Sequence, residues 1–240
     1  MAELGTVTRT LLGLGLARDA SDERILAGRI CQACLDGLDV DGAAISVLTA
    51  TASRQTLWAT DPIADRLEEL QFSLNEGACM EAATTGAPVF VTDLARSPHT
   101  ARWPVFAAAA AEQTGIGALY ALPLQWGSVN LGVLDLYRHE PGALTDAQRR
   151  DALSAADTAA LMLLGQRTDP GDGAVGWLDH ELGHRAEVHQ ATGMVLVQLG
   201  IDAADALARL RAHAFVHQRL LVDVARDVVA HRLVFTEDMP

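Results

Sequence analysis

The sequence HRAEVHQATGMVLVQLGIDAADALARLRAHAFVHQRLLVDVARDVVAHRLVF occupies residues 184–235. Apolar residues recur through it every three or four positions, which is the period of an amphipathic helix. Gly200 stands where a helix C-cap is expected, and Asp202 is placed to N-cap the helix that follows. The pattern predicts three short helices joined by tight turns. Such a bundle is too small to bury a large core by itself.

The charge balance of this stretch differs from that of the rest of the chain. The 240 residues carry a formal net charge of −13, yet residues 180–235 hold six Arg, six Asp or Glu and six of the eight His. The chain contains no Lys. Arginine binds phosphate through two parallel hydrogen bonds and stacks on bases, so these residues are suited to RNA. A GC-rich genome explains an Arg-only, Ala-rich composition equally well. A pI near 4.9 argues against non-specific binding to polyanions.

Five basic or aromatic-ring side chains lie close together in the second predicted helix and the turn after it. This Arg/His cluster consists of Arg209, Arg211, His213, His217 and Arg219. Cations of this kind hold an RNA backbone, while planar side chains stack on unpaired bases. The alternative is a solvated helix face whose arginines pair with Asp205 or Asp223. The residues alone leave both interpretations open.

Short sequence blocks in this region follow one another in a characteristic order. They are QATG at 190–193, the apolar MVLVQLGI after it, DAADA at 202–206, LR at 210–211 and LVDVA at 221–225. In this order they closely resemble the ANTAR domain, an RNA-binding helical module of bacterial transcription antiterminators. The resemblance implies RNA contacts by Gln190, Thr192, Gly193 and the Arg/His cluster. Many members carry Lys where this chain has Thr192.

Gly193 is an unusual residue for the interior of a helix. It costs about 1 kcal/mol relative to Ala at such a position. The close approach of another backbone, from protein or RNA, would explain why it is tolerated.

The chain before this region alternates between helix and strand patterns. Helices are predicted at 21–38 (with Ser21 as N-cap), 62–72, 80–85, 105–114 and 146–166, and strands at 43–50, 54–60, 88–93, 115–125 and 129–137. This order indicates an α+β fold with a mixed antiparallel sheet flanked by helices. We expect four segments: a loose lead-in at 1–20 that can hold a short helix, the α+β domain at 21–167, a Gly/Pro/Asp linker at 168–176 and the helical domain at 177–236.

The α+β region also resembles a known family. The resemblance rests on EGACMEA at 76–82, GAPVFVTDL at 86–94, RWPVF at 102–106 and PLQWGSVNLGVLDLYR at 123–138. These blocks resemble the GAF domain, a sensor of small molecules or redox signals that often dimerises through its flanking helices. The family implies a pocket between the sheet and residues 76–114, lined by Phe72, Glu76, Cys79 and Trp103. The alternative is that these side chains fill the core and the pocket is closed.

The three cysteines admit structural and chemical interpretations. Cys31 and Cys34 are spaced to share the apolar face of a helix, which favours buried structural thiols over a redox or metal site. Cys79 follows a turn that contains glycine, at a predicted helix N-terminus, where a thiolate is favoured, although packing is the commoner role. Asp135 lies inside a predicted strand, and its spacing is compatible with capping a loop or facing the pocket.

Several function classes lack their sequence signatures. The chain shows no catalytic triad, no metal-binding helix motif, no phosphate loop, no NKxFDE motif of cyclic-nucleotide GAF domains and no recognisable tetrapyrrole attachment site. Residues 1–20 lack a continuous apolar core, and no apolar stretch reaches the roughly 20 residues of a membrane span. An odd number of cysteines gives no disulfide framework. We therefore expect a cytoplasmic protein that is not an enzyme, with no cofactor, metal or membrane partner.

Taken together, the two resemblances imply a signal-responsive, homodimeric antiterminator. The GAF domain would sense a small molecule or redox signal, and the ANTAR domain would bind paired hairpin loops in leader RNA. Helices at 146–166 and 177–198 would carry the signal and form the dimer contact. Two alternatives stay open. One is a ligand-binding module whose helices dock a protein partner, and the other is a methionine sulfoxide reductase that uses Cys31, Cys34 and Cys79.

Overall fold

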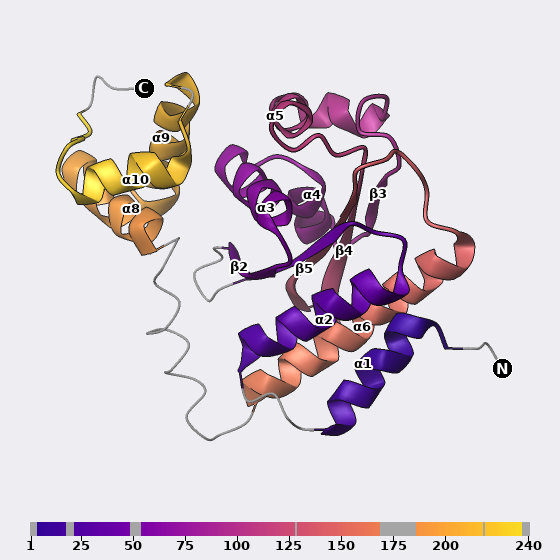
Figure 1. Cartoon of the computed structure of the whole chain (residues 1–240). Coiled ribbons are helices and arrows are strands. Elements are labelled where there is room, and N and C mark those ends of the chain that lie inside the picture. The colour runs from indigo at the N-terminus through magenta and orange to yellow at the C-terminus, as the bar shows by residue number, and fades with distance from the viewer. Residues whose placement is uncertain are drawn as a thin grey trace. The chain divides into compact units, whose positions relative to one another are not determined.

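The computed structural model describes residues 4–17, 22–48, 54–127, 129–168, 186–217 and 219–236. The chain divides into two compact units, residues 1–169 and residues 170–240. The expected N-cap Ser21, most of the expected linker and residues 177–185 of the expected helical domain lie outside the described residues. Figure 1 shows the elements of both units.

The first unit is built on a five-stranded sheet with the order β2-β1-β5-β4-β3, in which every pairing is antiparallel. Its strands are β1 (Gly42–Leu48), β2 (Arg54–Ala59), β3 (Val89–Val91), β4 (Ala118–Trp126) and β5 (Val129–Arg138). Strand β5 lies in the middle of the sheet, and its residues from Leu131 to Tyr137 are all buried. The α+β class expected from the sequence is confirmed.

Helices cover both faces of this sheet (Figure 1). One face carries α1 (Thr6–Ala17), α2 (Glu23–Gly37) and α6 (Asp146–Thr168). The other carries α3 (Pro62–Leu74), α4 (Ala78–Thr85) and α5 (Pro104–Thr114), with the 3₁₀ turn η1 (Pro98–Arg102) before α5. Two hydrophobic cores result, one on each face of the sheet.

Alternation along β5 decides which side chain enters which core. Leu134 and Leu136 pack into the core under α2 and α6. Val133 and Tyr137 pack into the core under α3, α4 and α5. Because successive strand residues face opposite sides, Asp135 is directed into the second core between two apolar neighbours.

The structure settles two local features of the N-terminal region. Of the two possibilities left open for the lead-in, it shows the short helix, since residues 6–17 form α1 and bury Val7 and Leu11 against the first core. The N-cap of α2 is Asp22, whose carboxylate accepts a hydrogen bond from the Arg24 backbone N–H at 2.8 Å. An Asp at this position satisfies an N–H that the helix itself cannot.

The described residues of the second unit form three short helices, as the apolar period predicted. They are α8 (Ala186–Leu199), α9 (Ala203–Val216) and α10 (Leu221–Val229). Gly200 ends α8 with a φ of 65°, a left-handed conformation that favours glycine. Asp202 caps α9 by accepting a hydrogen bond from the Asp205 N–H at 2.8 Å. After α10 the chain returns across the bundle and buries Phe235, whose N–H donates to Gln198 Oε1 at 2.9 Å.

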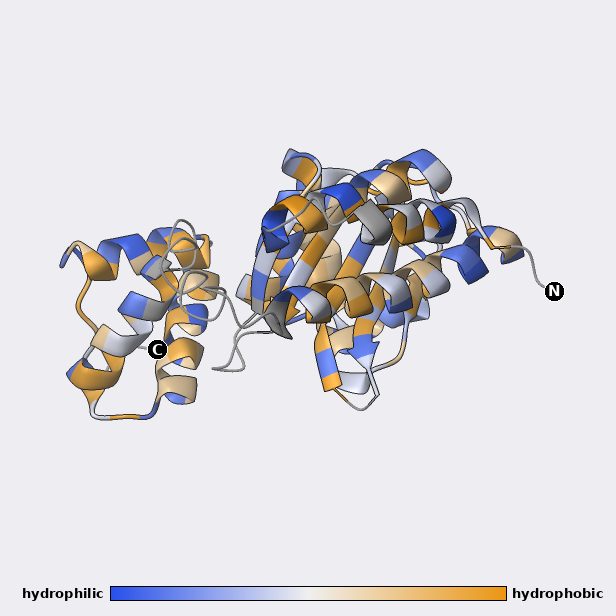
Figure 2. Ribbon diagram, turned by 90° about the horizontal axis from the view of Figure 1, so that it is seen from below, coloured by the Kyte–Doolittle hydropathy of each residue, from blue (hydrophilic) through white to orange (hydrophobic). Residues whose placement is uncertain are grey.

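The helices of both units alternate apolar and polar residues around their circumference (Figure 2). Across the described residues, no single helix is both long and apolar enough to cross a membrane. Residues 190–199 of α8 together with α9 reach that length and composition only as a pair, and a bend of 103° separates them.

Candidate functional site

One face of α8 is open to solvent in the segment where the sequence predicted RNA contacts. Gln190, Gly193 and Val197 follow one another at helical spacing, and all three are exposed. Val197 is 77% exposed, although Val is an apolar residue. A Cβ added at Gly193 would meet no other described part of the chain within 4 Å. Among the described residues of this unit, no packing contact therefore requires a glycine at position 193.

The neighbouring Thr192 is placed differently from the sequence prediction. Its side chain is buried, and its hydroxyl donates to the Val188 carbonyl oxygen at 2.7 Å. Thr192 lies one residue from Gly193 and so faces about 100° away around the helix, toward the bundle core. A direct contact of this side chain with RNA is not supported by its position.

His213 is also buried, contrary to its prediction as a surface residue. Its ring packs against the His217 ring at 4.2 Å between centroids and against Phe235 at 5.3 Å. Its Nδ1 atom has no hydrogen-bond partner among the described residues. Burial, together with the nearby His217 and Arg219 charges, lowers the pKa of His213 below its ordinary value. His217 itself is exposed.

The arginines of the Arg/His cluster are partly engaged within the unit. Arg219 donates to Asp227 Oδ2 at 2.6 Å, and Arg232 donates to the other oxygen of the same carboxylate at 2.7 Å. These two partners lower the pKa of Asp227. Arg209 and Arg211 are partly buried, and desolvation lowers the pKa of Arg211. The expected pairing of arginine with Asp223 involves Arg226 instead, at 3.3 Å.

The structure therefore divides the residues predicted to contact RNA. Gln190, Gly193, His217 and Arg219 are exposed, whereas Thr192 and His213 belong to the core. Helical spacing alone could have separated Thr192 from its neighbours, since Val188, Ala191 and Val195 mark the buried side of the same helix.

In the first unit, the residues predicted to line a GAF pocket have separate roles. Glu76 accepts hydrogen bonds from the Val105 and Phe106 N–H groups, each at 3.0 Å, and so satisfies the first turn of α5. Trp103 is buried and meets Phe106 edge to face, with ring centroids 6.3 Å apart. Phe72 is buried as well. These three placements favour the interpretation in which the side chains fill the core.

A buried polar cluster lies on the same face of the sheet and was only partly foreseen. It consists of Ser46 from β1, Glu68 and Gln71 from α3, Cys79 from α4 and Asp135 from β5. We call it the Cys79 cluster. Ligand atoms of Glu68, Cys79 and Asp135 all lie within 4.8 Å of one another. This is a set of donors that could hold a metal ion.

Hydrogen bonds tie the Cys79 cluster together. The Cys79 thiol donates to Glu68 Oε1 at 3.7 Å and lies 3.7 Å from Ser46 Oγ. Gln71 bridges two members, since its Oε1 accepts from the Cys79 N–H at 2.8 Å and its Nε2 donates to Asp135 Oδ2 at 3.1 Å. The sequence signal for Glu68 and Gln71 was available, because both are polar residues at positions that the helical period assigns to the buried face of α3.

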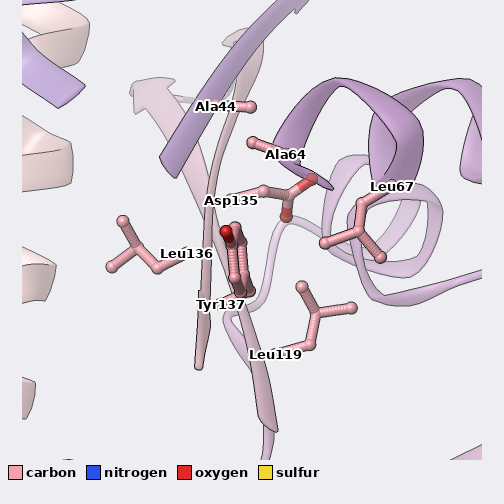
Figure 3. Close-up of a pocket in the computed structure, with 7 residues that line it drawn as sticks. All are labelled: Ala44, Ala64, Leu67, Leu119, Asp135, Leu136 and Tyr137. Carbon is pink, nitrogen blue, oxygen red and sulfur yellow. The ribbon is translucent and has the colours of Figure 1, made fainter. Parts of the chain in front are cut away.

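A small cavity of about 10 Å³ adjoins this cluster (Figure 3). It is lined by Ala44, Ala64, Leu67, Leu119, Asp135, Leu136 and Tyr137, and none of the residues predicted for the GAF pocket is among them. Figure 3 shows the Asp135 carboxylate projecting from β5 toward α3, while Leu136 points the other way. Asp135 thus faces a cavity, but one other than the pocket predicted from the sequence. That volume admits about one water molecule.

The remaining two cysteines pack into the opposite core. Cys31 and Cys34 are fully buried under the other face of the sheet. Burial raises the pKa of Cys31 well above its ordinary value and that of Cys34 to about 12. Both thiols are therefore protonated at neutral pH, as structural cysteines are expected to be.

Comparison with solved structures supports the fold of the first unit. The chain is similar to the GAF domain of a phosphoenolpyruvate-protein phosphotransferase from Acinetobacter, with 11% identity, a TM-score of 0.52 and coverage of 69% of this chain and 96% of that one. It is similar to the corresponding domain from Coxiella burnetii, with 13% identity, a TM-score of 0.52 and coverage of 67% and 92%. It is also similar to free methionine-R-sulfoxide reductase from Neisseria meningitidis, with 13% identity, a TM-score of 0.50 and coverage of 70% and 95%. At these identities the likeness shows the fold alone.

Family models cover both units, while the comparison with curated proteins gives no match. Residues 20–163 match the GAF domain and residues 178–229 match the ANTAR domain. The first match spans more than half of the chain. The chain therefore belongs to the family of GAF-domain proteins and joins its GAF domain to an ANTAR domain, which is the organisation of a signalling regulator.

Proposed function

We propose that this protein is a cytoplasmic, homodimeric transcription antiterminator in which the GAF domain senses a small-molecule or redox signal. The ANTAR domain binds paired hairpin loops in leader RNA and so stabilises an antiterminator over a terminator. Each protomer takes one hairpin, and dimerisation raises the effective concentration of the second binding site. The match of residues 178–229 to the ANTAR domain supports the RNA-binding half of this proposal.

The exposure of Gly193 is the observation that carries the proposal. A glycine inside α8 weakens the helix, and nothing described in the unit needs the space beside it. A contact from outside the unit accounts for it, because a residue without a Cβ lets a nucleic-acid backbone come closer to the helix. Gln190, one turn earlier and also exposed, supplies an amide that can donate to and accept from an unpaired base.

The experiment compares binding of the full chain to a two-hairpin leader RNA and to the same RNA with scrambled loops, at two salt concentrations. Loop-dependent binding that weakens with salt is expected, because phosphate contacts release counterions. Gly193→Ala should stabilise α8 by about 1 kcal/mol and yet weaken RNA binding at least tenfold. Ser154→Ala is the control, since Ser154 is an exposed helix residue of the first unit.

A purely structural role for Gly193 does not explain a variant, Gly193→Ala, that is more stable and yet binds RNA more weakly. If Gly193→Ala raises stability and leaves RNA affinity unchanged, the assignment of this face to RNA is wrong.

Dimerisation through the flanking helices is part of the same proposal. Leu12 in α1 and Leu161 in α6 are large apolar residues that stay exposed on helices that pack against each other. A second protomer covering them would bury this apolar surface. Sedimentation equilibrium should report a dimer for the parent protein and a monomer for Leu161→Glu. A monomeric parent protein would remove this part of the proposal.

A protein-docking role for the helical unit is the second candidate, and specific side chains favour it. Val197, Phe215, Val216 and Val234 are all more than half exposed. Arg219 and Arg226 are meanwhile held by acidic residues of their own unit. Such a surface suits a protein partner better than an RNA backbone. Equal or absent binding to both RNAs by the folded protein would favour this candidate.

A further inference from the structure

The Cys79 cluster has the chemistry of a metal site. Its three ionisable members come from α3, α4 and β5, and each is at most 5% exposed. Burying two carboxylates and a thiol side by side is costly unless a cation or shared protons neutralise them. As described, the Cys79 thiol proton bridges to Glu68. A bound divalent cation would replace that proton and offset most of the negative charge of the two carboxylates and the thiolate.

We propose that Glu68, Cys79 and Asp135 form a binding site for a divalent transition-metal cation, with Zn²⁺ as the best match. A thiolate ligand excludes the hard cations Ca²⁺ and Mg²⁺, which take oxygen ligands. One sulfur and two carboxylate oxygens instead suit a borderline-soft, tetrahedral ion. The site lies wholly within the first unit, so the inference does not depend on the proposed RNA contact.

The observed spacing fits such an ion. Bond lengths typical of zinc place a sulfur and an oxygen ligand about 3.5 Å apart in a tetrahedral site. The Cys79 Sγ and Glu68 Oε1 atoms are 3.7 Å apart, and the Ser46 hydroxyl lies at the same distance from the sulfur. The Asp135 carboxylate oxygen lies within 4.8 Å of both the Cys79 and the Glu68 ligand atoms, so an inward movement on the order of 1 Å brings the three atoms around one ion. Ser46 Oγ, or a water in the adjoining cavity, completes four ligands.

Neighbouring polar groups orient the ligands as the outer partners of metal sites do. Thr56 donates to Glu68 Oε2 at 3.3 Å, and Gln71 donates to Asp135 Oδ2 at 3.1 Å. One oxygen of each carboxylate is thus held by a fixed donor, and we assign the other oxygen of each to the cation. Gln71 also holds the Cys79 backbone, which fixes the start of α4 beside the site.

Metal binding at this point would join two consecutive helices to a strand that lies more than 40 residues later in the sequence. The ion would tie α3 and α4 to the central strand β5. Because the thiol must lose its proton to bind, affinity should fall with decreasing pH and binding should release a proton.

The test uses the full chain, stripped of metal with a chelator and titrated with Co²⁺, which reports thiolate ligation by a charge-transfer band in the near ultraviolet. One equivalent should produce this band. Cys79→Ser should abolish it, while Glu68→Gln and Asp135→Asn should weaken Co²⁺ binding at least tenfold. Cys31→Ser is the matched control, since Cys31 is equally buried but lies in the opposite core and should leave the band unchanged.

The band also distinguishes Co²⁺ bound at the Cys79 cluster from Co²⁺ bound by histidines of the second unit, because imidazole ligands give no thiolate charge-transfer band. Absence of the band in the parent protein, or its persistence in Cys79→Ser, overturns the proposal. Since Cys79→Ser can fail to fold, X-ray absorption of the zinc-loaded parent protein supplies a variant-free measurement. One sulfur ligand with the remainder oxygen supports the site, and a ligand shell without sulfur overturns it.

Discussion

The carboxylate of Asp151 in α6 caps the first turn of α1, which lies more than 140 residues earlier in the chain. Asp151 Oδ2 accepts from the Val7 N–H at 2.9 Å, and Oδ1 accepts from the Thr8 N–H at 3.0 Å and from its hydroxyl at 2.7 Å. A Cβ at Gly5 would overlap this carboxylate. This one buried carboxylate therefore ties the start of α1 to α6, in addition to the apolar packing of Val7 and Leu11.

Asp151→Ala should release α1 from the unit. Three donors lose their acceptor, and a lost cap together with buried unsatisfied donors costs about 2 kcal/mol or more. Hydrogen exchange of residues 6–17 and denaturant unfolding would measure the change. Asp146→Ala is the control, because Asp146 lies in the same helix but is exposed. Unchanged exchange in α1 would mean that apolar packing alone holds the helix.

Both tyrosines should resist ionisation in the native protein. Burial raises the pKa of Tyr120, and burial together with the Asp61 carboxylate raises the pKa of Tyr137. The Tyr137 hydroxyl donates to Asp61 Oδ1 at 3.0 Å. Because the folded pKa values lie above the unfolded value near 10, these tyrosines contribute stability below about pH 10 that is lost as pH rises further. Ultraviolet titration should show tyrosinate only well above pH 10, whereas denatured protein should titrate near 10.

Asp61 makes a second contribution, because it also caps α3 through the Ile63 and Ala64 N–H groups. Tyr137→Phe should therefore cost about 1 kcal/mol, and Asp61→Ala about 2 kcal/mol. If the two variants lose the same free energy of unfolding, the Asp61 cap of α3 contributes nothing beyond the hydrogen bond from Tyr137.

The helical unit should lose stability in mild acid because of His213. Its folded pKa is lowered from about 6.5, so the neutral ring is favoured in the fold. The stability that His213 contributes to the helical unit is fully present above about pH 6.5. It is lost as pH falls from there through the folded pKa. Hydrogen exchange of α9 at pH 7.5 and at pH 5 would measure this loss, and His213→Leu should make it smaller.

His217→Gln is the matched variant for that prediction. It removes one of the charges that lower the His213 pKa, while His213 itself stays buried. The loss of stability between pH 7.5 and pH 5 should therefore become smaller. If His213→Leu loses as much stability between pH 7.5 and pH 5 as the parent protein, titratable groups other than His213 cause the loss.

All three thiols should be unreactive in the native protein. Cys31, Cys34 and Cys79 are buried, and burial raises the pKa of the first two. Reaction with a thiol reagent at neutral pH should therefore be negligible before unfolding and should reach three equivalents after it. Rapid labelling of native Cys79 would instead revive the interpretation of this residue as a reactive cysteine.

Asp227 should restrain Arg219 in RNA binding. Asp227→Asn removes the carboxylate that Arg219 and Arg232 share, which frees two guanidinium groups for phosphate. Under the proposed function, RNA affinity should rise several-fold and depend more steeply on salt. Asp223→Asn is a partial control, since Asp223 pairs with Arg226 and not with the Arg219 side chain through its carboxylate. Weaker RNA binding by folded Asp227→Asn would mean that the ion pairs shape the binding surface.

The sequence by itself determined the elements whose signals are local. Gly200 ends α8 and Asp202 begins α9, because a left-handed residue and a capping carboxylate act within one turn. The alternation of the strands and the apolar period of the helices fixed the α+β class, since each pattern describes one buried face. The order of the motifs identified the GAF and ANTAR domains, which the family models bear out.

Only the tertiary structure decided what long-range packing controls. Residues 6–17 look like a weak helix until Asp151, far along the chain, supplies the acceptor for their first turn. His213 and Thr192 look like surface residues until the return of Phe235 and the packing of α8 bury them. Glu68, Cys79 and Asp135 come from three separate elements, so no spacing along the chain records that they meet. Contacts of this kind depend on the mutual placement of whole elements, and a local period carries no information about that placement.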